Sequence, residues 1–333
     1  MLKRGVTCRD EFGRRAIARM RAGRGWWPVA LTMLEDVQGH CSESDLALLD
    51  ELYARTSGGI GIHKMTRRGR MREVDERLAD ELERRFAGLS SLVVHDMACS
   101  NAITSLDMHL TLSERRHVVV HATDYFDALW YVTPDGSRWT AVFDADRQPL
   151  QFVGRRFVIS AAHREPRKFI ANVVLRAILM RTVLPKATEL LEANARVTDA
   201  YAKELAVRRI RLFHPLSLQA ADVDTNFRVG RHNLFEPSPI RSHVVRVMNA
   251  LTPHHFNGER IRAGIRACLR SLEPGGVLIL GRSAEEDRGK PRATAYEWDE
   301  GRLTPLWGVN GGYEWPDLVD SLECDKSREP VWA

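Results

Sequence analysis

The fold class of this chain is decided by the stretch Leu92-Val93-Val94-His95-Asp96-Met97-Ala98-Cys99-Ser100-Asn101-Ala102. A short apolar run ends in the acid Asp96, and small residues then lead into a helical pattern from Ile103 to Leu112. A strand that brings a carboxylate to a sheet edge, small residues that let the backbone approach a ligand, and a helix N-terminus together begin a nucleotide-binding α/β unit. The glycines usual in such a loop are alanines here, Ala98 and Ala102.

A second acid follows a second apolar run. Val118 to Thr123 reads as a buried strand, and Asp124 stands at its C-terminal end. In Rossmann-like sites an acid at this position holds the two ribose hydroxyls. The alternative is an ordinary helix-cap or turn aspartate.

The remaining pattern predicts an α/β protein with a Rossmann-like parallel sheet. Residues 1–88 are helical in pattern and predict an N-terminal helical cap, and residues 89–333 predict the Rossmann-like domain. Aromatic-rich alternating runs and two helical patterns predict a β-hairpin and helical insertion at about 128–206. The strands expected for the parallel sheet cover 92–95, 117–122, 210–214, 227–233, 243–247 and 277–281.

The segment Leu272-Glu273-Pro274-Gly275-Gly276-Val277-Leu278 lies between a helical pattern and an apolar strand. Proline ends a helix, and the two glycines supply the dihedral angles of a sharp reversal. We therefore expect a tight turn that feeds Val277–Leu280 into the sheet.

Taken in order, these motifs resemble those of class I S-adenosylmethionine-dependent methyltransferases. The chain is most similar to the branch that contains the chemotaxis receptor glutamate methyltransferases. The resemblance rests on the Asp-x-x-Cys-Ser form of the first motif, the pair Asn233-Leu234, and Asn249 before Pro-Gly-Gly-x-Leu-x-Leu-Gly-x-Ser. It covers roughly 92–124 and 210–283, about a third of the chain.

The resemblance implies a site for S-adenosyl-L-methionine. Asp124 would take the ribose hydroxyls, Asn249 would lie beside the sulfonium, and Asn233 and Leu234 would frame the adenine. The methionine and ribose end would be lined by Asp96, Ala98, Ser100 and Asn101. The family also places a Thr and an Arg near the cofactor carboxylate, for which the candidates are Thr66, Arg67 and Arg68; the alternative is an exposed basic loop.

The catalytic candidates are Tyr125, Asn249 and His254. Tyr125 directly follows the ribose acid, where an aromatic face attracts a cationic sulfonium. His254 lies in a loop suited to general-base work. Ordinary packing is the alternative for each ring.

We expect an S-adenosylmethionine-dependent transferase, most simply a methyltransferase for a small-molecule acceptor, in a setting such as bacterial secondary metabolism. Met248 stands where the chemotaxis enzymes have an arginine, and the long insertion is foreign to them, so a protein-glutamate acceptor is not expected. Two alternatives stay open. One is a cyclase that releases methylthioadenosine and forms azetidine-2-carboxylate, and the other is a catalytically silent cofactor-binding regulatory protein.

Composition and charge limit the class of protein, its compartment and its partners. With 333 residues, 44% hydrophobic and 28% charged, the chain reads as globular, with no membrane-spanning run and no secretory signal. Five scattered cysteines without a CxxC pair favour a reducing cytoplasm and no metal site. The net charge of +5 comes without an RNA-binding motif, so a nucleic-acid partner is not favoured, while a homodimer stays open.

Overall fold

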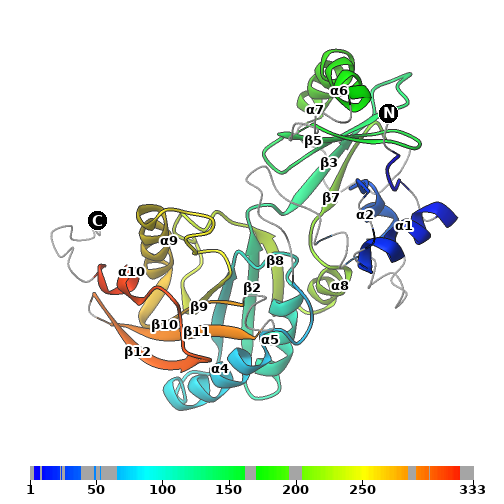
Figure 1. Cartoon of the computed structure of the whole chain (residues 1–333). Coiled ribbons are helices and arrows are strands. Elements are labelled where there is room, and N and C mark those ends of the chain that lie inside the picture. The colour runs from blue at the N-terminus through cyan, green and yellow to red at the C-terminus, as the bar shows by residue number, and fades with distance from the viewer. Residues whose placement is uncertain are drawn as a thin grey trace. The chain divides into compact units, whose positions relative to one another are not determined.

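The computed structural model describes residues 4–7, 10–22, 24, 27–38, 49, 53, 66–161, 170–194, 205–283, 290–299 and 301–322. The chain forms two compact units (Figure 1). The first contains Met1–Met65 and Phe126–Leu212, and the second contains Thr66–Tyr125 and Phe213–Ala333. The domain limits predicted at residue 88 and at about 128–206 stay predictions.

The second unit is built on a seven-stranded mixed sheet with the order β12-β11-β10-β9-β1-β2-β8. Its strands are β1 Leu92–Met97, β2 Val118–Asp124, β8 Phe227–Arg231, β9 Ser242–Met248, β10 Leu272–Ser283, β11 Pro291–Asp299 and β12 Arg302–Val309. The five strands from β8 to β10 pair in parallel, while β11 and β12 extend the sheet in antiparallel fashion beyond β10. Numbered in chain order, the parallel strands lie 3-2-1-4-5, which is the Rossmann order.

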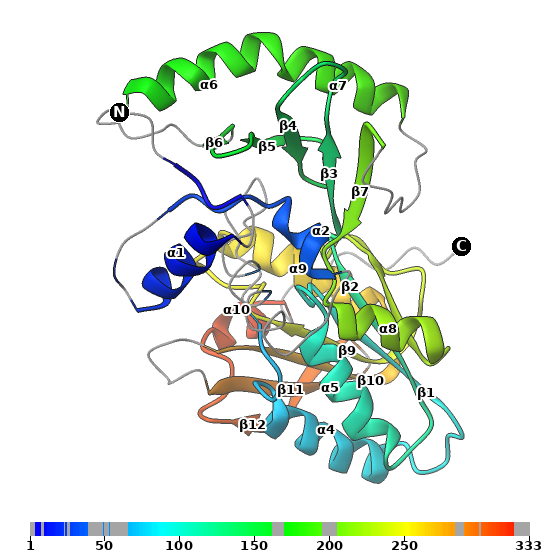
Figure 2. The same cartoon turned by 90° about the vertical axis from the view of Figure 1, so that its right-hand side faces the viewer.

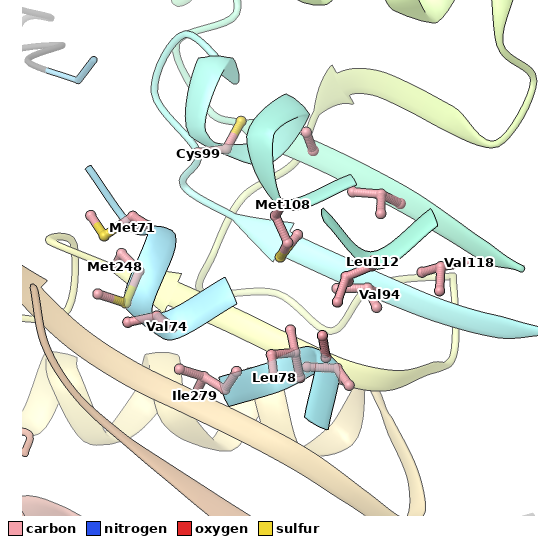
Figure 3. Packing of buried hydrophobic residues seen from close by; sticks show 14 of the residues in the cluster. Met71, Val74, Leu78, Val94, Cys99, Met108, Leu112, Val118, Met248 and Ile279 are labelled. Carbon is pink, nitrogen blue, oxygen red and sulfur yellow. The ribbon is translucent and has the colours of Figure 1, made fainter. Parts of the chain in front are cut away.

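Alternating residues of these strands face two separate cores. Val244, Val277 and Ile279 pack with residues of α4 (Arg72–Arg85) and α5 (Ile103–Ser113), against which α8 (Pro215–Val223) also packs. Figure 3 shows Val74 and Leu78 of α4 beside Ile279. The other face carries Val245, Val247, Leu278 and Leu280, which pack with α9 (Gly258–Arg270) and α10 (Pro316–Asp320). Successive residues of the strands point to opposite faces, so apolar side chains and helices cover both faces of the sheet.

The predicted sharp turn at Pro274-Gly275-Gly276 is a local irregularity inside β10. The register to β9 shifts between Leu272 and Val277, and Gly275 has φ +71°. A Cβ on Gly276 would lie 2.8 Å from the carbonyl oxygen of Glu273. The glycines are therefore needed as expected, but they shape a bulged strand entry instead of a reversal.

The first unit contains a five-stranded antiparallel sheet with the order β6-β5-β4-β3-β7. Its strands are β3 Ala128–Val132, β4 Thr140–Phe143, β5 Pro149–Val153, β6 Val158–Ser160 and β7 Val207–Arg211. One face packs against α1 (Glu11–Arg21) and α2 (Met33–Gln38), and the other against α6 (Ile170–Thr182) and α7 (Leu184–Ala193). Figure 2 shows α6 and α7 over this sheet.

Two predictions need correction or qualification here. The strand predicted at 210–214 for the parallel sheet was wrong, because β7 ends at Arg211 and pairs antiparallel with β3. Of the predicted N-terminal helical cap, the segment 39–65 lies outside the described residues except for Leu49 and Tyr53. Among the described residues, no helix has the length and apolar composition to cross a membrane.

Candidate functional site

The strand order of the second unit reverses between β1 and β9. From β1 the chain proceeds to β2 and β8 on one side, whereas β9 and β10 lie on the other. In open α/β sheets, ligands bind outside the carboxyl ends of the strands at such a switch point. The residues that follow β1 and β9 are therefore the first candidates for a site.

The loop after β1 has an unusual backbone. Ala98, Ser100 and Ala102 have φ values of 55°, 64° and 63°, in the left-handed region that favours glycine. The loop is held against β2 by two hydrogen bonds: Cys99 N donates to Thr123 O (3.0 Å) and Ser100 N donates to Asp124 Oδ2 (2.8 Å). A left-handed non-glycine residue costs about 1–2 kcal/mol, so the loop keeps a glycine-type path at an energetic cost.

Asn249, directly after β9, is a fourth left-handed residue, with φ 63°. Its backbone N–H donates to Gly281 O (2.8 Å), and its side-chain Oδ1 accepts from Ser283 N (2.7 Å). Arg70 donates through Nη2 to Ser283 O (2.9 Å). A guanidinium thus reaches this edge from the segment before α4, two residues beyond the predicted Thr66–Arg68.

Asn101 is fully buried in the loop after β1. Its Oδ1 accepts from Ile103 N (3.1 Å), and its backbone carbonyl accepts from His214 N (2.8 Å). Its Nδ2 has no hydrogen-bond partner among the described residues. A buried amide donor without a partner is rare in folded proteins and can be satisfied by a bound ligand.

Asp96 is engaged inside the protein. Arg246 donates to it through Nε (2.9 Å to Oδ1) and Nη2 (2.6 Å to Oδ2), and Ser105 Oγ also donates to Oδ2 (2.5 Å). Arg246 Nη1 donates to Asp75 of α4 at 2.5 Å. The three charged residues are each at most 2% exposed. Asp96 therefore has a structural partner at the position where direct cofactor contact was expected.

The adenine candidates form a turn of their own. Asn233 donates through Nδ2 to Glu236 Oε1 (2.7 Å), and its Oδ1 accepts from Phe235 N (3.1 Å). Leu234 is buried in the same core as Val245 and Val247. The amide of Asn233 is thus used to shape the segment that follows β8.

The remaining candidates, Tyr125 and His254, are more exposed to solvent. Tyr125 is half-buried, with the Arg231 guanidinium carbon 4.7 Å from its ring centroid. His254 is exposed, and its ring centroid is 6.4 Å from that of Trp315. Hydrogen bonds thus join Ser100 to Asp124, and Asn249 through Ser283 to Arg70, while the ring contact of His254 with Trp315 belongs to neither group.

Two features of the site were missed from sequence. Arg246 lies within the run Val244-Val245-Arg246-Val247, and a charge inside an apolar strand requires a buried partner. That signal was available, but its partner Asp75 is 171 residues away in the chain. Within the described part of the chain, no cluster of three His, Cys, Asp or Glu side chains is arranged to hold a metal ion.

No protein-family model and no curated protein sequence matches the chain. Solved structures of S-adenosylmethionine-dependent enzymes are distantly similar. One is CalS10 with bound S-adenosylmethionine, an amino pentose methyltransferase from Micromonospora echinaspora, with 9% identity over 85% of this chain and 87% of that chain and a TM-score of 0.30. Another is an S-adenosylmethionine-dependent methyltransferase from Clostridium acetobutylicum, with 6% identity over 76% and 78% and a TM-score of 0.30.

The chain spans less than two thirds of the length of three other matched structures. It covers 58% of a protein from Methanococcus maripaludis, 44% of the [4+2]-cyclase SpnF and 46% of a protein from Galdieria sulphuraria. These likenesses are distant, so the function has to be inferred from the contacts of this chain.

Proposed function

We propose that the chain binds S-adenosylmethionine at the carboxyl ends of β1 and β9 and uses it for methyl transfer to a small-molecule acceptor. The observation that carries the proposal is the concentration of left-handed residues there: Ala98, Ser100, Ala102 and Asn249. Backbone strain of this kind persists where the surrounding structure enforces it, and it clusters at ligand sites.

The residues of the site suit the parts of this cofactor. Asp124 ends β2 and fixes the loop through Ser100 N, a position from which a carboxylate can accept from ribose hydroxyls. The buried Asn101 Nδ2 offers an amide donor. Arg70, bound to Ser283 beside Asn249, brings a guanidinium that suits the carboxylate of the methionine moiety.

When bound, the cofactor supplies a sulfonium whose methyl group is already electrophilic. The task of the chain is then to align an acceptor and exclude water, because a well-oriented bound nucleophile has a high effective concentration. Tyr125 would face the cation, and an imidazole nitrogen of His254 would take a proton from an acceptor that carries one. Asp96 acts as a positioning residue, since its carboxylate holds Arg246 and Ser105.

Calorimetric titration with S-adenosylmethionine tests the binding step. We expect Asp124→Asn to weaken binding by about ten- to hundredfold, the worth of hydrogen bonds to a charged group. Asp299→Asn, at the exposed end of β11, is the matched control and should bind as the parent does. Equal affinity of the parent and Asp124→Asn would overturn the assignment of Asp124, and no binding by the parent would overturn the proposed function.

Incubation with the cofactor alone separates the reactions. Methyl transfer gives adenosylhomocysteine only when an acceptor is present, so a panel of amines, phenols and carboxylates is added in separate reactions. Release of methylthioadenosine without an acceptor would show that the chain is a cyclase and not a methyltransferase. Tight binding without either product across the panel would favour a regulatory protein, which the methyl groups of Ala98 and Ala102 in the loop also allow.

A further inference from the structure

The buried side chains of Asp75, Arg246 and Asp96 contain one more negative charge than positive when both aspartates are ionised. Arg246 comes from β9, Asp96 from β1 and Asp75 from α4. Arg246 Nη1 meets Asp75 at 2.5 Å, and Nη2 meets Asp96 at 2.6 Å. Burying an ion pair is already costly, and a second buried carboxylate adds to the cost. A fold that needed only packing here would use apolar side chains.

The charged surroundings of Asp75 do not remove this excess. On the neighbouring α5, Asp107 is another acid, which itself accepts from Arg68 Nε (2.9 Å) and Gly69 N (2.7 Å). Glu297 of β11 pairs with Arg85 of α4, and within α4 Glu81 pairs with Arg84 and Arg85. Burial raises the pKa of Asp75 to about 7; Arg246 opposes this shift, while Asp96 and Asp107 add to it. Near neutral pH the cluster therefore passes between formal charges of 0 and −1.

The cluster lies directly beneath the switch point. Asp96 and Arg246 are register partners on the two strands that flank it. Asn249 is three residues beyond Arg246, and a strand rises about 3.3 Å per residue, so the Cα atoms of these two residues lie about 10 Å apart. At this distance, with an effective dielectric constant of about 20, one unit charge changes the affinity of a charged ligand on the order of tenfold.

We infer that the Asp75–Arg246–Asp96 cluster makes the cofactor site selective for a cationic sulfonium over the neutral thioether that remains after methyl transfer. The inference rests on the proposed function. An excess negative charge beneath the crevice stabilises the positively charged donor and leaves the neutral product with no such gain. Asp75 and Arg246 are then specificity-determining residues that touch neither the cofactor nor the acceptor.

The test compares dissociation constants of S-adenosylmethionine and S-adenosylhomocysteine from pH 6 to pH 8. In the parent protein, the preference for the sulfonium should rise with pH on the order of tenfold, as Asp75 ionises. Asp75→Asn keeps an oxygen acceptor for Arg246 and removes the titration, so this rise should vanish. Glu73→Gln, two residues away on the exposed side of α4, is the control and should behave as the parent.

Titration of the amino groups of the two ligands is common to all three proteins and cancels in the comparison. The inference is overturned when the parent and Asp75→Asn show the same pH dependence of the preference. Binding of neither ligand overturns the proposed function with it, whereas equal binding of both at every pH overturns the inference alone. Should Asp75→Asn not fold, calorimetry of the parent at pH 6 in two buffers of different ionisation enthalpy decides. The amino groups of both ligands are almost fully protonated at this pH, so S-adenosylmethionine must release more protons on binding than the thioether does.

Discussion

Ala98 is held in a conformation that its methyl group disfavours. Its φ of 55° lies in the left-handed region, and the half-buried residue packs at the edge of the core around Val245 and Leu278. Ala98→Gly removes the steric cost but adds freedom to the unfolded chain. We expect a net gain of about 1 kcal/mol in the free energy of unfolding, measured by urea denaturation.

The matched control is Ala220→Gly in α8, where the backbone is helical and the same change should destabilise by about 1 kcal/mol. Ala102→Gly should lie between the two, because Ala102 is also left-handed but its methyl group is fully buried. Destabilisation by Ala98→Gly as large as that of Ala220→Gly would show that the loop is not strained at Ala98.

His95 gives a second residue-scale prediction. Its Nε2 lies 2.8 Å from Thr123 Oγ1, and its ring neighbours those of His121 and His232, with centroids 6.2 and 5.4 Å away. Burial, with smaller contributions from His232 and His121, lowers the pKa of His95 to about 3. Because the unfolded chain takes up this proton near pH 6.5, His95 lowers the free energy of unfolding by up to about 1.4 kcal/mol for each pH unit below that value.

The measurement is the free energy of unfolding of the parent and of His95→Gln between pH 4 and pH 8. The difference between the two should change in favour of His95→Gln as the pH falls below 6.5. Asp75 acts in the opposite sense, since its raised pKa means that folding takes up a proton between about pH 4 and pH 7, but this contribution is common to both proteins. Parallel pH profiles would contradict the neutral, buried state of His95.

At the scale of elements, Asn249 ties the end of β9 to β10. Asn249→Ala loses the hydrogen bond from Ser283 N and places at φ 63° a residue that tolerates the left-handed region less well than asparagine does, whereas Asn249→Gly loses the hydrogen bond without this steric cost. We expect Asn249→Ala to destabilise by about 2–3 kcal/mol and Asn249→Gly by about 1 kcal/mol, measured by chemical denaturation. Equal losses in the free energy of unfolding would mean that the side-chain hydrogen bond of Asn249 matters and its left-handed backbone does not.

The sequence predicts the elements of the second unit better than their partners. Apolar runs ending in Asp96 and Asp124 predicted β1 and β2, because parallel strands covered on both faces are nearly continuous in apolar residues. The same reasoning failed at 210–214. The strand Val207–Arg211 carries three arginines, which do not suit a parallel strand covered by helices on both faces, and it pairs antiparallel with β3. Partners such as Asp75 and Arg246 come together only through the tertiary fold.

The left-handed loop shows the same limit for the site. Alanine does not favour positive φ, so the alanines at 98 and 102 did not predict the left-handed backbone that the loop adopts. The role of Asp124 could be proposed because an acid that ends a parallel strand lies at the ligand edge of the sheet, whereas the role of Asn249 was implied by the family resemblance. The engagement of Asp96 by Arg246 could not, since both are interior strand residues whose facing depends on register.

At the scale of the whole molecule, each unit has hydrophobic cores of its own. Two cores, around Leu129 and Tyr131 and around Phe143 and Phe152, belong to the first unit. Two others, around Val94 and Ile279 and around Val245 and Leu278, belong to the second. Units with separate cores commonly unfold separately, so a single two-state transition is not expected for this chain.

We expect differential scanning calorimetry to resolve two transitions, of which the proposed ligand raises only one. All residues assigned to the S-adenosylmethionine site belong to the second unit. A ligand at a hundredfold excess over its dissociation constant stabilises the unit that binds it by about 2.7 kcal/mol and leaves an independent unit unchanged. Val94→Ala, in the core of the second unit, should lower the same transition that the ligand raises, while Phe152→Ala should lower the other. One transition that moves as a whole in every case would show that the two units fold as one.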